Sequence, residues 1–427
     1  MIKRIAVLFL LFLVISSLLP VLAAQDFSRI DRTTVNGMNI LLQKNGSKLV
    51  EVALLLKSGS GLDPVDRKGV ALIMNELVML NLLYNSKVEL GEVNVETNPD
   101  FSLITIKTTS DKAEKALEKV KELLSYPLYS YDIISDLKEI YGTDIKGIPA
   151  LTKSYFEFTK EFYGQDHPYN NWVDPDSIAA ISGTDVYRWY RQTYQPGNAI
   201  LAISGGCRQN IEQLEKLFSD IRSEQVDRRL LIKPVLLDKD LDLEEEDPNG
   251  RGTSIVIGFS APRIQDPEYP AFRVIAYYLE EYQHYFEELR EKEGLIYTEI
   301  VYYNYLEKPK APNIVFATMT DPESLKTVEL KTLGIVKQLA ETGIEQAEIA
   351  KVVKAMKAEI TAKKASGKGL AYLNALSQYL QTQLVYDENL APKLEQVKTE
   401  DIKKAAAKYL QHYIKVAYIP KKLAEDL

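Results

Sequence analysis

Residues 185–205 read DVYRWYRQTYQPGNAILAISG and contain a strand of the buried type. The apolar run 199–204 ends at the glycine pair Gly205-Gly206, as is typical where a core strand meets a turn. Upstream, residues 34–43 and 48–57 are also β-rich, and the pair Asn45-Gly46 between them is a strong turn signal. We therefore expect a hairpin or adjacent strands at the start of the fold.

Segments with helical and with strand spacing alternate along both halves of the chain. In the first half we expect helices at 69–83, 111–124 and 131–163, the last broken near Gly147 and Pro149, and a strand at 100–109. In the second half we expect strands at 254–259, 313–319 and 415–419, helices at 269–291 and 323–342, and further helical segments to about residue 408. The sequence therefore predicts an α+β protein built from two similar halves.

The domain boundaries follow from length and composition. A chain of 427 residues exceeds what one hydrophobic core usually spans. We expect a signal peptide at 1–23, a first domain at 24–225, a connecting segment at 226–253 and a second domain at 254–427. The connecting segment contains an acidic, turn-rich stretch without apolar periodicity. It fits a surface excursion of the second domain equally well, because residues 235–243 could pair as a strand.

The first residues indicate export. Lys3 and Arg4 precede an almost wholly apolar stretch at 5–19, and residues 21–23 form a cleavage site of the signal-peptide type. An uncleaved membrane anchor is the alternative, because residues 5–24 approach the length that spans a bilayer. We expect a periplasmic or extracellular protein that contacts the membrane only if the leader is retained.

Composition excludes two classes of function. The formal net charge is -8, and no basic stripe is interleaved with aromatic residues, which argues against a nucleic-acid partner. Cys207 is the single cysteine, so an internal disulfide framework is excluded and a buried thiol is expected.

The segment 185–205 resembles the end of the first domain in the pitrilysin and mitochondrial-processing-peptidase family of zinc peptidases. Members pair a helix ending in Tyr-x-Pro-x-Asn with a strand ending in glycine, as residues 185–205 do. Residues 289–297, LREKEGLIY, resemble the second-domain signature of the family, and Gly69 stands where the family has Gly-Leu-Ala before its zinc motif. The resemblance runs from about residue 30 to the C-terminus. It implies a clamshell of two halves, each a mostly antiparallel sheet covered by helices.

The zinc motif of active relatives is degenerate in this chain. Those relatives carry His-x-x-Glu-His on a helix, where two imidazoles bind zinc and the glutamate takes a proton from metal-bound water. The corresponding positions are Leu72, Asn75 and Glu76. Leucine has no lone pair for a metal, and an asparagine amide accepts no proton at neutral pH. The third ligand position falls near Asp144, which we interpret as a surface carboxylate. We expect no metal or other cofactor in this chain.

Arg290 and Tyr297 match a pair that, by the resemblance, reaches the catalytic centre from the second half and contacts the peptide near the scissile carbonyl. A guanidinium and a phenol are both donors that can stabilise negative charge developing on oxygen. Taken singly, Arg290 also fits a solvated charge paired with Glu287 or Glu293, and Tyr297 a packed strand residue. Within the signature, the two are our candidate catalytic residues.

The resemblance implies that small members of the family pair one subunit carrying the metal motif with one carrying the Arg/Tyr pair. We therefore hypothesise a non-catalytic subunit of an exported heterodimeric zinc endopeptidase that encloses unfolded peptides. Its partner would be a similar exported subunit with an intact His-x-x-Glu-His motif and the zinc. The alternative is a pseudo-enzyme that binds peptides or proteins as a chaperone or scaffold. Independent activity is disfavoured, because no nucleophile, base and orienting residue can be assembled.

Tyrosine is abundant, with 26 residues. Clusters at 277–278, 282–285 and 302–305 are candidates for lining a peptide channel, because tyrosine combines a large rigid contact area with one hydrogen bond. Ordinary packing between helices and sheet is the simpler explanation for the same clusters.

Overall fold

The computed structural model describes residues 29–84, 89–126, 131–144, 149–224, 228–247, 252–280, 285, 287–366, 369–383 and 387–421. The expected signal peptide at 1–23 lies outside the described residues, as does the expected helix break at Gly147. Pro149 is described, and it is the N-cap of the helix that follows the break.

The first half forms a six-stranded sheet in which β2 and β6 are parallel and all other neighbours are antiparallel. In spatial order the strands are β1 (Asp31–Val35), β2 (Met38–Lys44), β6 (Ala199–Gly205), β3 (Leu49–Leu56), β5 (Ser102–Thr109) and β4 (Glu92–Thr97). One face shares an apolar core with α2 (Val70–Tyr84), α3 (Ala113–Ser125), α4 (Tyr131–Asp144), α6 (Pro175–Ala180), α7 (Gly183–Thr193) and α8 (Ile211–Phe218). Cys207 is buried in this core, as expected.

The chain opens with a hairpin, but its turn is not at the expected place. Asn36 and Gly37 join β1 to β2 with φ angles of 50° and 85°, the left-handed values that a tight two-residue hairpin turn requires. The expectation that the strands around Asn45-Gly46 are neighbours is wrong. β6 lies between β2 and β3, because the buried run 199–205 pairs with both strands.

The second half forms a five-stranded sheet in which β7 and β11 are parallel. In spatial order the strands are β7 (Leu241–Asp247), β11 (Tyr413–Pro420), β8 (Thr253–Ser260), β10 (Asn313–Thr320) and β9 (Thr298–Tyr303). The helices packed against it or near it are α9 (Tyr269–Leu279), α11 (Leu325–Glu341), α12 (Gln346–Ser366), α14 (Asp387–Leu394) and α15 (Thr399–Tyr409). β7 lies within the expected connecting segment 226–253.

The expected helix at 269–291 is only partly continuous in the described residues. α9 ends at Leu279, and residues 287–291 form a short π-helix, η5 (Glu287–Glu291). The remaining short turns are η1 (Ser60–Leu62), η3 (Pro168–Asn170), η4 (Pro196–Asn198) and η6 (Pro322–Ser324).

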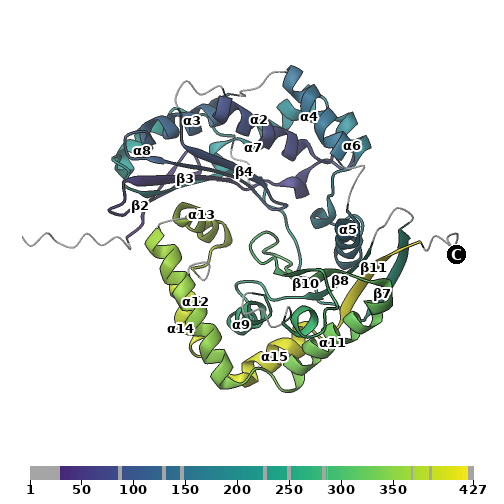
Figure 1. Cartoon of the computed structure of the whole chain (residues 1–427). Coiled ribbons are helices and arrows are strands. Elements are labelled where there is room, and N and C mark those ends of the chain that lie inside the picture. The colour runs from purple at the N-terminus through teal and green to yellow at the C-terminus, as the bar shows by residue number, and fades with distance from the viewer. Residues whose placement is uncertain are drawn as a thin grey trace, which may run out of the picture.

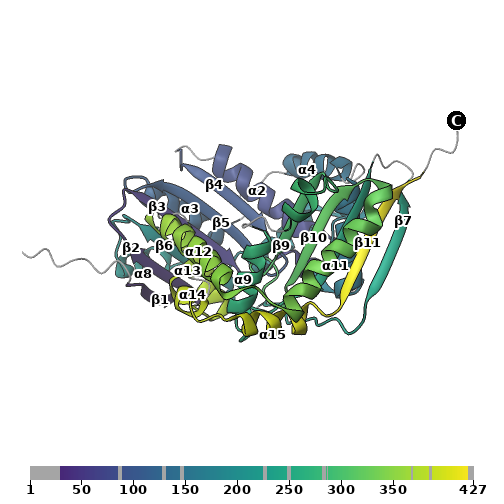
Figure 2. The ribbon, with the colours of Figure 1, turned by 60° about the horizontal axis from the view of Figure 1, so that its bottom comes forward.

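Each sheet is covered on its second face by a helix from the other half of the chain. α13 (Leu370–Leu380), carried by α12, packs against β3 and β6 of the first sheet, whereas α5 (Ala150–Tyr163) packs against β8 and β11 of the second. Figure 1 shows α13 directly below the first sheet and α5 beside the second, between the two halves. In the view of Figure 2 the two sheets lie side by side, with α12, α13 and α14 in front of the first.

Alternation along the strands explains this arrangement. Leu54 of β3 faces the helices of its own half, whereas Leu55 faces the core shared with α13. On the second sheet, Gly258 of β8 faces α5 so closely that a Cβ there would lie 2.2 Å from the Phe158 ring. The inner strands of both sheets, such as β3, β6, β8 and β10, are therefore buried on both faces. The expected α+β fold, with two mostly antiparallel sheets covered by helices in a clamshell of two halves, is confirmed.

A buried ion pair joins the two halves. Asp100, in the turn before β5, is fully buried, and its carboxylate pairs with the Lys310 ammonium in the connection between β9 and β10. Tyr169 of η3 and Tyr379 of α13 donate hydroxyl hydrogen bonds to the same carboxylate. Lys310 Nζ also donates to the carbonyl oxygen of Leu230 at 2.7 Å. Segments from both halves and from the chain between them therefore converge on one ion pair.

The first half also caps the start of α13. The Glu51 carboxylate on β3 accepts hydrogen bonds from the backbone N–H groups of Gly369 and Ala371, at 3.2 and 2.9 Å. Burial raises the pKa of Glu51, and the two N–H groups of the helix N-terminus oppose this shift. Asn374 Nδ2 adds a hydrogen bond to Gln43 Oε1 at 2.9 Å. Polar contacts thus fix α13 in register on the first sheet.

We expect Asp100→Asn to lower the free energy of unfolding by about 3 kcal/mol, because it leaves the Lys310 ammonium without its counter-charge at a poorly hydrated joint. Urea denaturation followed by circular dichroism measures this change. Asp66→Asn is the matched control, because Asp66 forms an exposed pair with Arg67, and it should change stability by less than about 0.5 kcal/mol. Equal effects of the two substitutions would contradict a structural role for the buried pair.

Candidate functional site

The candidate site is built around α2, the helix that carries Leu72, Asn75 and Glu76. Gly69 precedes it with a φ of 97°, and a Cβ at this position would meet Ile178 and Val173 side chains within 3.3 Å. The backbone N–H of Gly69 donates to Asp63 Oδ2 at 2.7 Å, and that of Ala71 donates to Asp63 Oδ1 at 3.1 Å. A buried carboxylate therefore caps the helix, where the helix dipole favours negative charge.

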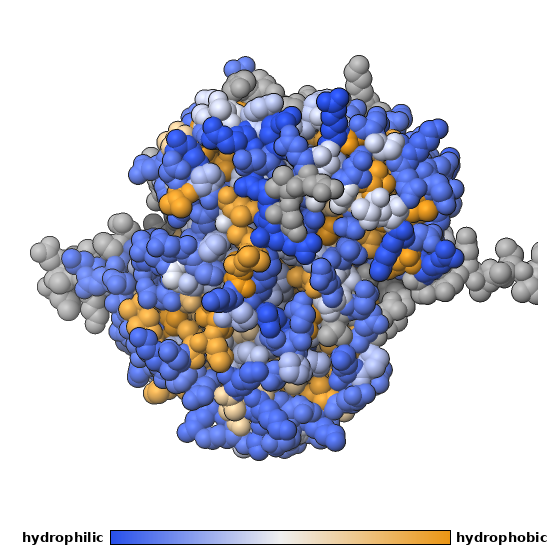
Figure 3. Space-filling model, turned by 180° about the vertical axis from the view of Figure 1, so that it is seen from behind, coloured by the Kyte–Doolittle hydropathy of each residue, from blue (hydrophilic) through white to orange (hydrophobic). Residues whose placement is uncertain are grey.

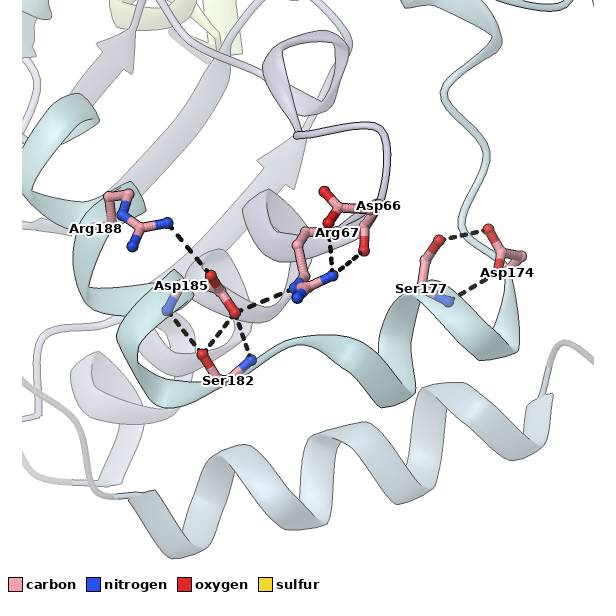
Figure 4. A network of polar contacts seen from close by, with 7 residues as sticks. All are labelled: Asp66, Arg67, Asp174, Ser177, Ser182, Asp185 and Arg188. Carbon is pink, nitrogen blue, oxygen red and sulfur yellow. Dashed lines mark hydrogen bonds and ion pairs between the residues drawn. The ribbon is translucent and has the colours of Figure 1, made fainter.

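Figure 4 shows a polar network that ties the segment before α2 to the start of α7. Ser182 and Asp185 form a capping box at the N-terminus of α7. Arg67 Nε donates to Asp185 Oδ2 at 3.3 Å, and the Arg188 guanidinium lies 3.6 Å from the other oxygen of the same carboxylate. The Asp185 carboxylate therefore holds the segment that precedes α2 against the start of α7.

Asn75, which the sequence resemblance aligns with the catalytic base, is 2% exposed, and all its polar atoms have hydrogen-bond partners. Its Nδ2 donates to Thr97 Oγ1 at 2.6 Å and to Ser102 Oγ at 3.0 Å. Its Oδ1 accepts the Tyr194 hydroxyl hydrogen at 2.7 Å. Burial raises the pKa of Tyr194 far above its usual range, so this phenol stays protonated and donates. The amide therefore joins α2, β4, β5 and the end of α7.

Zinc does not fit these residues. Leu72 and Glu76 lie one turn apart on α2 and are both partly exposed, but only Glu76 offers a metal ligand. The Asn75 amide is committed to three neighbours and cannot take the role of a base. Asp144 ends α4, and its side chain lies outside what the structure describes. Across the described stretches, no three His, Cys, Asp or Glu side chains are grouped in a way that could hold a metal ion.

Arg290 and Tyr297 both come from the connection that leads into β9. Arg290 is on η5 and is exposed. Tyr297 is 56% exposed, its N–H donates to the Met319 carbonyl oxygen at 2.9 Å, and its hydroxyl donates to Asp321 Oδ2 at 2.8 Å. The hydrogen bond to Asp321 raises the pKa of Tyr297. The Tyr297 ring is thus not packed in the core. Glu293, one of the two carboxylates expected to pair with Arg290, forms an ion pair with Lys331.

A cavity of about 230 Å³ lies in the second half, among α9, β9, the segment after β9 and α12. Its walls are rich in tyrosine and glutamate, and they include Tyr277, Tyr302, Tyr303, Tyr305, Glu280, Glu307, Glu359 and Arg273. The Arg273 guanidinium stacks on the Tyr305 ring, 4.5 Å from its centroid. Members of two of the tyrosine clusters therefore line a cavity, whereas Tyr285 is buried in the core and residue 282 is not described.

Sequence reasoning missed the residues that hold Asn75. Tyr194 and Asn198 belong to the Tyr-x-Pro-x-Asn motif, and both side chains form buried hydrogen bonds that hold neighbouring residues in place. Asn198 Nδ2 donates to Ser58 Oγ at 2.9 Å, next to the Ser58 carbonyl oxygen that accepts from Ser102 Oγ. The motif was a usable signal, because a buried tyrosine needs a partner for its hydroxyl.

Comparison with known proteins agrees with this geometry. Residues 180–356 match the family described as Peptidase M16 inactive domain. A structure of a peptidase M16 inactive domain from Pseudomonas fluorescens is similar with a TM-score of 0.79 at 19% identity, covering 93% of this chain and 100% of that chain. A protease from Helicobacter pylori is similar with a TM-score of 0.77 at 18% identity, covering 92% and 100%. No curated protein matches the sequence.

A larger relative shows the same fold within a longer chain. The periplasmic protease PqqL from Escherichia coli is similar with a TM-score of 0.72 at 15% identity, covering 92% of this chain but 45% of PqqL. The family match thus spans residues 180–356, the fold of the chain is that of these structures, and the sequence contains no His-x-x-Glu-His motif. Among the helices that the structure describes, none is both long and apolar enough to span a membrane.

The cap of α2 gives a prediction about pH. Burial raises the pKa of Asp63 to about 7, against the two N–H groups that lower it. The folded state then binds a proton more tightly than the unfolded chain, so this group's contribution to stability falls as the pH rises from about 4 to 7. We expect Asp63→Asn to remove this part of the pH dependence, as measured by urea denaturation between pH 4 and 8. Parallel pH profiles for the two proteins would contradict the assignment.

The contact between Asn75 and Tyr194 gives a second prediction. Asn75→Ala and Tyr194→Phe should each lower the free energy of unfolding by about 1–3 kcal/mol, because each leaves a buried polar partner unsatisfied. The double variant should lose less than the sum, with a coupling of about 1 kcal/mol measured by a double-mutant cycle. Tyr187→Phe, at an exposed tyrosine of α7, is the control and should be neutral. Strict additivity would show that the hydrogen bond contributes nothing.

Proposed function

We propose that this chain is the non-catalytic subunit of an exported, two-subunit zinc endopeptidase. The observation that carries the proposal is an asymmetry between the two halves. The helix of the zinc motif holds Leu72, Asn75 and Glu76, which fit no zinc, whereas Arg290 and Tyr297 of the second signature are exposed. A subunit that keeps only hydrogen-bond donors suits a partner that keeps the metal.

The proposed chemistry uses the two exposed donors. In the paired enzyme, the Arg290 guanidinium and the Tyr297 hydroxyl would donate to the peptide carbonyl oxygen as it gains negative charge, which stabilises the transition state more than the substrate. Tyr297 donates to Asp321 in the isolated chain, so it must exchange this partner for the substrate. The partner would supply zinc, which activates the attacking water.

Two features of the molecule support pairing. This chain covers 45% of the periplasmic protease PqqL, so that protease has room for a second unit of similar size in one chain. Seen from behind, the second half carries an apolar patch amid a mostly hydrophilic surface (Figure 3). Large contiguous apolar patches on the surface of water-soluble proteins are typical of interaction sites.

The substrate class in this proposal is an extended peptide. β4 is an edge strand in the first sheet and packs beside α2. An edge strand offers unpaired backbone groups to which a peptide can add as a further strand. The exposed side chains of β4, Glu92, Asn94 and Glu96, are polar and leave that edge open to water.

A second function is favoured by the cavity among α9, β9 and α12. Its tyrosine-rich walls can hold a peptide side chain without any metal. A pseudo-enzyme that binds peptides or proteins as a chaperone or scaffold is therefore the alternative, and it differs from the first function in needing no zinc-bearing partner.

Substitution of the two donors tests the proposed function. In the reconstituted pair, Tyr297→Phe and Arg290→Ala should each lower kcat by about 10- to 1000-fold with little change in KM, because each removes a donor used mainly in the transition state. Peptide hydrolysis under saturating substrate measures the effect. Tyr187→Phe is the control, as an exposed tyrosine far along the sequence from the signature. Unchanged kcat in both donor variants would overturn the donor role.

A further inference from the structure

The ammonium of Lys308 is enclosed by aromatic rings in the connection between β9 and β10. Its Nζ lies 4.9 Å from the centroid of the Tyr163 ring, 5.6 Å from that of Tyr155 and 5.8 Å from that of Trp172. Lys308 is 6% exposed, and its Nζ has no hydrogen-bond partner within the described part of the chain. A buried amine without a hydrogen bond is rare, because each unsatisfied donor costs free energy.

The rings around Lys308 come from the other half of the chain. Tyr155 and Tyr163 lie on α5, and Trp172 follows η3 and donates its Nε1 hydrogen to Thr159 of α5 at 2.8 Å. Tyr163 also forms hydrogen bonds with the connection between β9 and β10. Its hydroxyl donates to the Ala311 carbonyl oxygen at 2.9 Å and accepts from Asn313 Nδ2 at 3.0 Å. The cage therefore lies where first-half chain docks on the second sheet, two residues from the Lys310 pair.

Two effects act on the charge of Lys308. The faces of three aromatic rings attract the ammonium form. Burial removes its water and lowers the pKa of Lys308 to about 7, with Glu307 acting in the opposite direction. Without a hydrogen-bond acceptor nearby, burial costs the neutral amine less hydration free energy than it costs the ammonium.

Three titratable groups beside the cage, Tyr155, Tyr163 and His167, do not change charge between pH 7 and 10. Burial raises the pKa of Tyr155 to about 12, and it raises the pKa of Tyr163 well above its usual range. On the η3 side, burial and then Lys308 lower the pKa of His167, so that this imidazole is neutral above pH 7. Among these groups, the change of charge above neutrality belongs to Lys308.

We propose that the Lys308 cage is a pH-sensitive latch between α5 and the connection from β9 to β10, firm when the amine is neutral and looser when it is protonated. Releasing Lys308 to water restores its ordinary affinity for a proton, so release takes up a proton at any pH between about 7 and 10. The released form is therefore favoured as the pH falls through this window. Because the latch joins α5 of the first half to the second half, its protonation changes the stability of the contact between the two halves.

Titration of the intact wild-type chain tests the latch directly. With lysine labelled with carbon-13 at Cε, one resonance should titrate near pH 7, well apart from the exposed lysines, and it should be missing in Lys308→Met. If every lysine resonance titrates near pH 10, the proposal fails. This measurement does not depend on a peptidase partner.

Stability as a function of pH tests the consequence for the joint. The unfolding equilibrium constant of the wild type should fall by up to about tenfold per pH unit between pH 7 and 10, relative to Lys308→Met, whose thioether fills the cage without a charge. Lys337→Met, at a lysine that is 71% exposed on α11, is the matched control and should follow the wild type. Identical pH profiles for Lys308→Met and the wild type would overturn the latch.

Discussion

The structure depends on one constraint, which is that each sheet has two apolar faces but only one set of helices from its own half. α13 covers the second face of the first sheet, and α5 covers the second face of the second sheet. Burial of apolar surface is the dominant favourable term in folding, so neither half is complete without the other. The buried pair of Asp100 and Lys310 lies where these exchanged segments meet, and it fixes their relative position.

The contacts of α2 explain why the fold needs no metal at this helix. α2 is held by its cap at Asp63, by the Arg67–Asp185 contact and by the hydrogen bonds of Asn75, and none of these needs a metal. An asparagine at the position of the base is neutral and satisfied in a site where a carboxylate would be buried. α2 is thus part of the scaffold of the first half, whereas Arg290 and Tyr297 are exposed to solvent.

The long apolar segments of this chain could be predicted from sequence, and shorter or polar ones could not. The strand at 199–205 and α2 have continuous apolar runs or helical spacing, and both are confirmed. β4 alternates Glu92, Asn94 and Glu96 with partly buried residues, so its pattern is weak at an edge. The turn at Asn36-Gly37 was overlooked in favour of Asn45-Gly46, although both pairs favour turns.

Only those residues of the candidate site that belong to a sequence motif could be predicted. The positions of Leu72, Asn75 and Glu76 on one helix follow from local spacing, and the structure places them there. The main partner of Asn75 comes from a distant segment, since Tyr194 is 119 residues away; likewise, in the joint between the halves, Lys310 is 210 residues from Asp100. Local patterns carry no information on such contacts, because they arise only when the sheets and the exchanged helices assemble.

Purification of the chain from its native source, with identification of bound proteins by mass spectrometry and of zinc by elemental analysis, tests the central claim most directly. The account predicts a near-equimolar second subunit that carries His-x-x-Glu-His and about one zinc per pair. Recovery of this chain alone and free of zinc would contradict a split peptidase and favour a peptide-binding pseudo-enzyme.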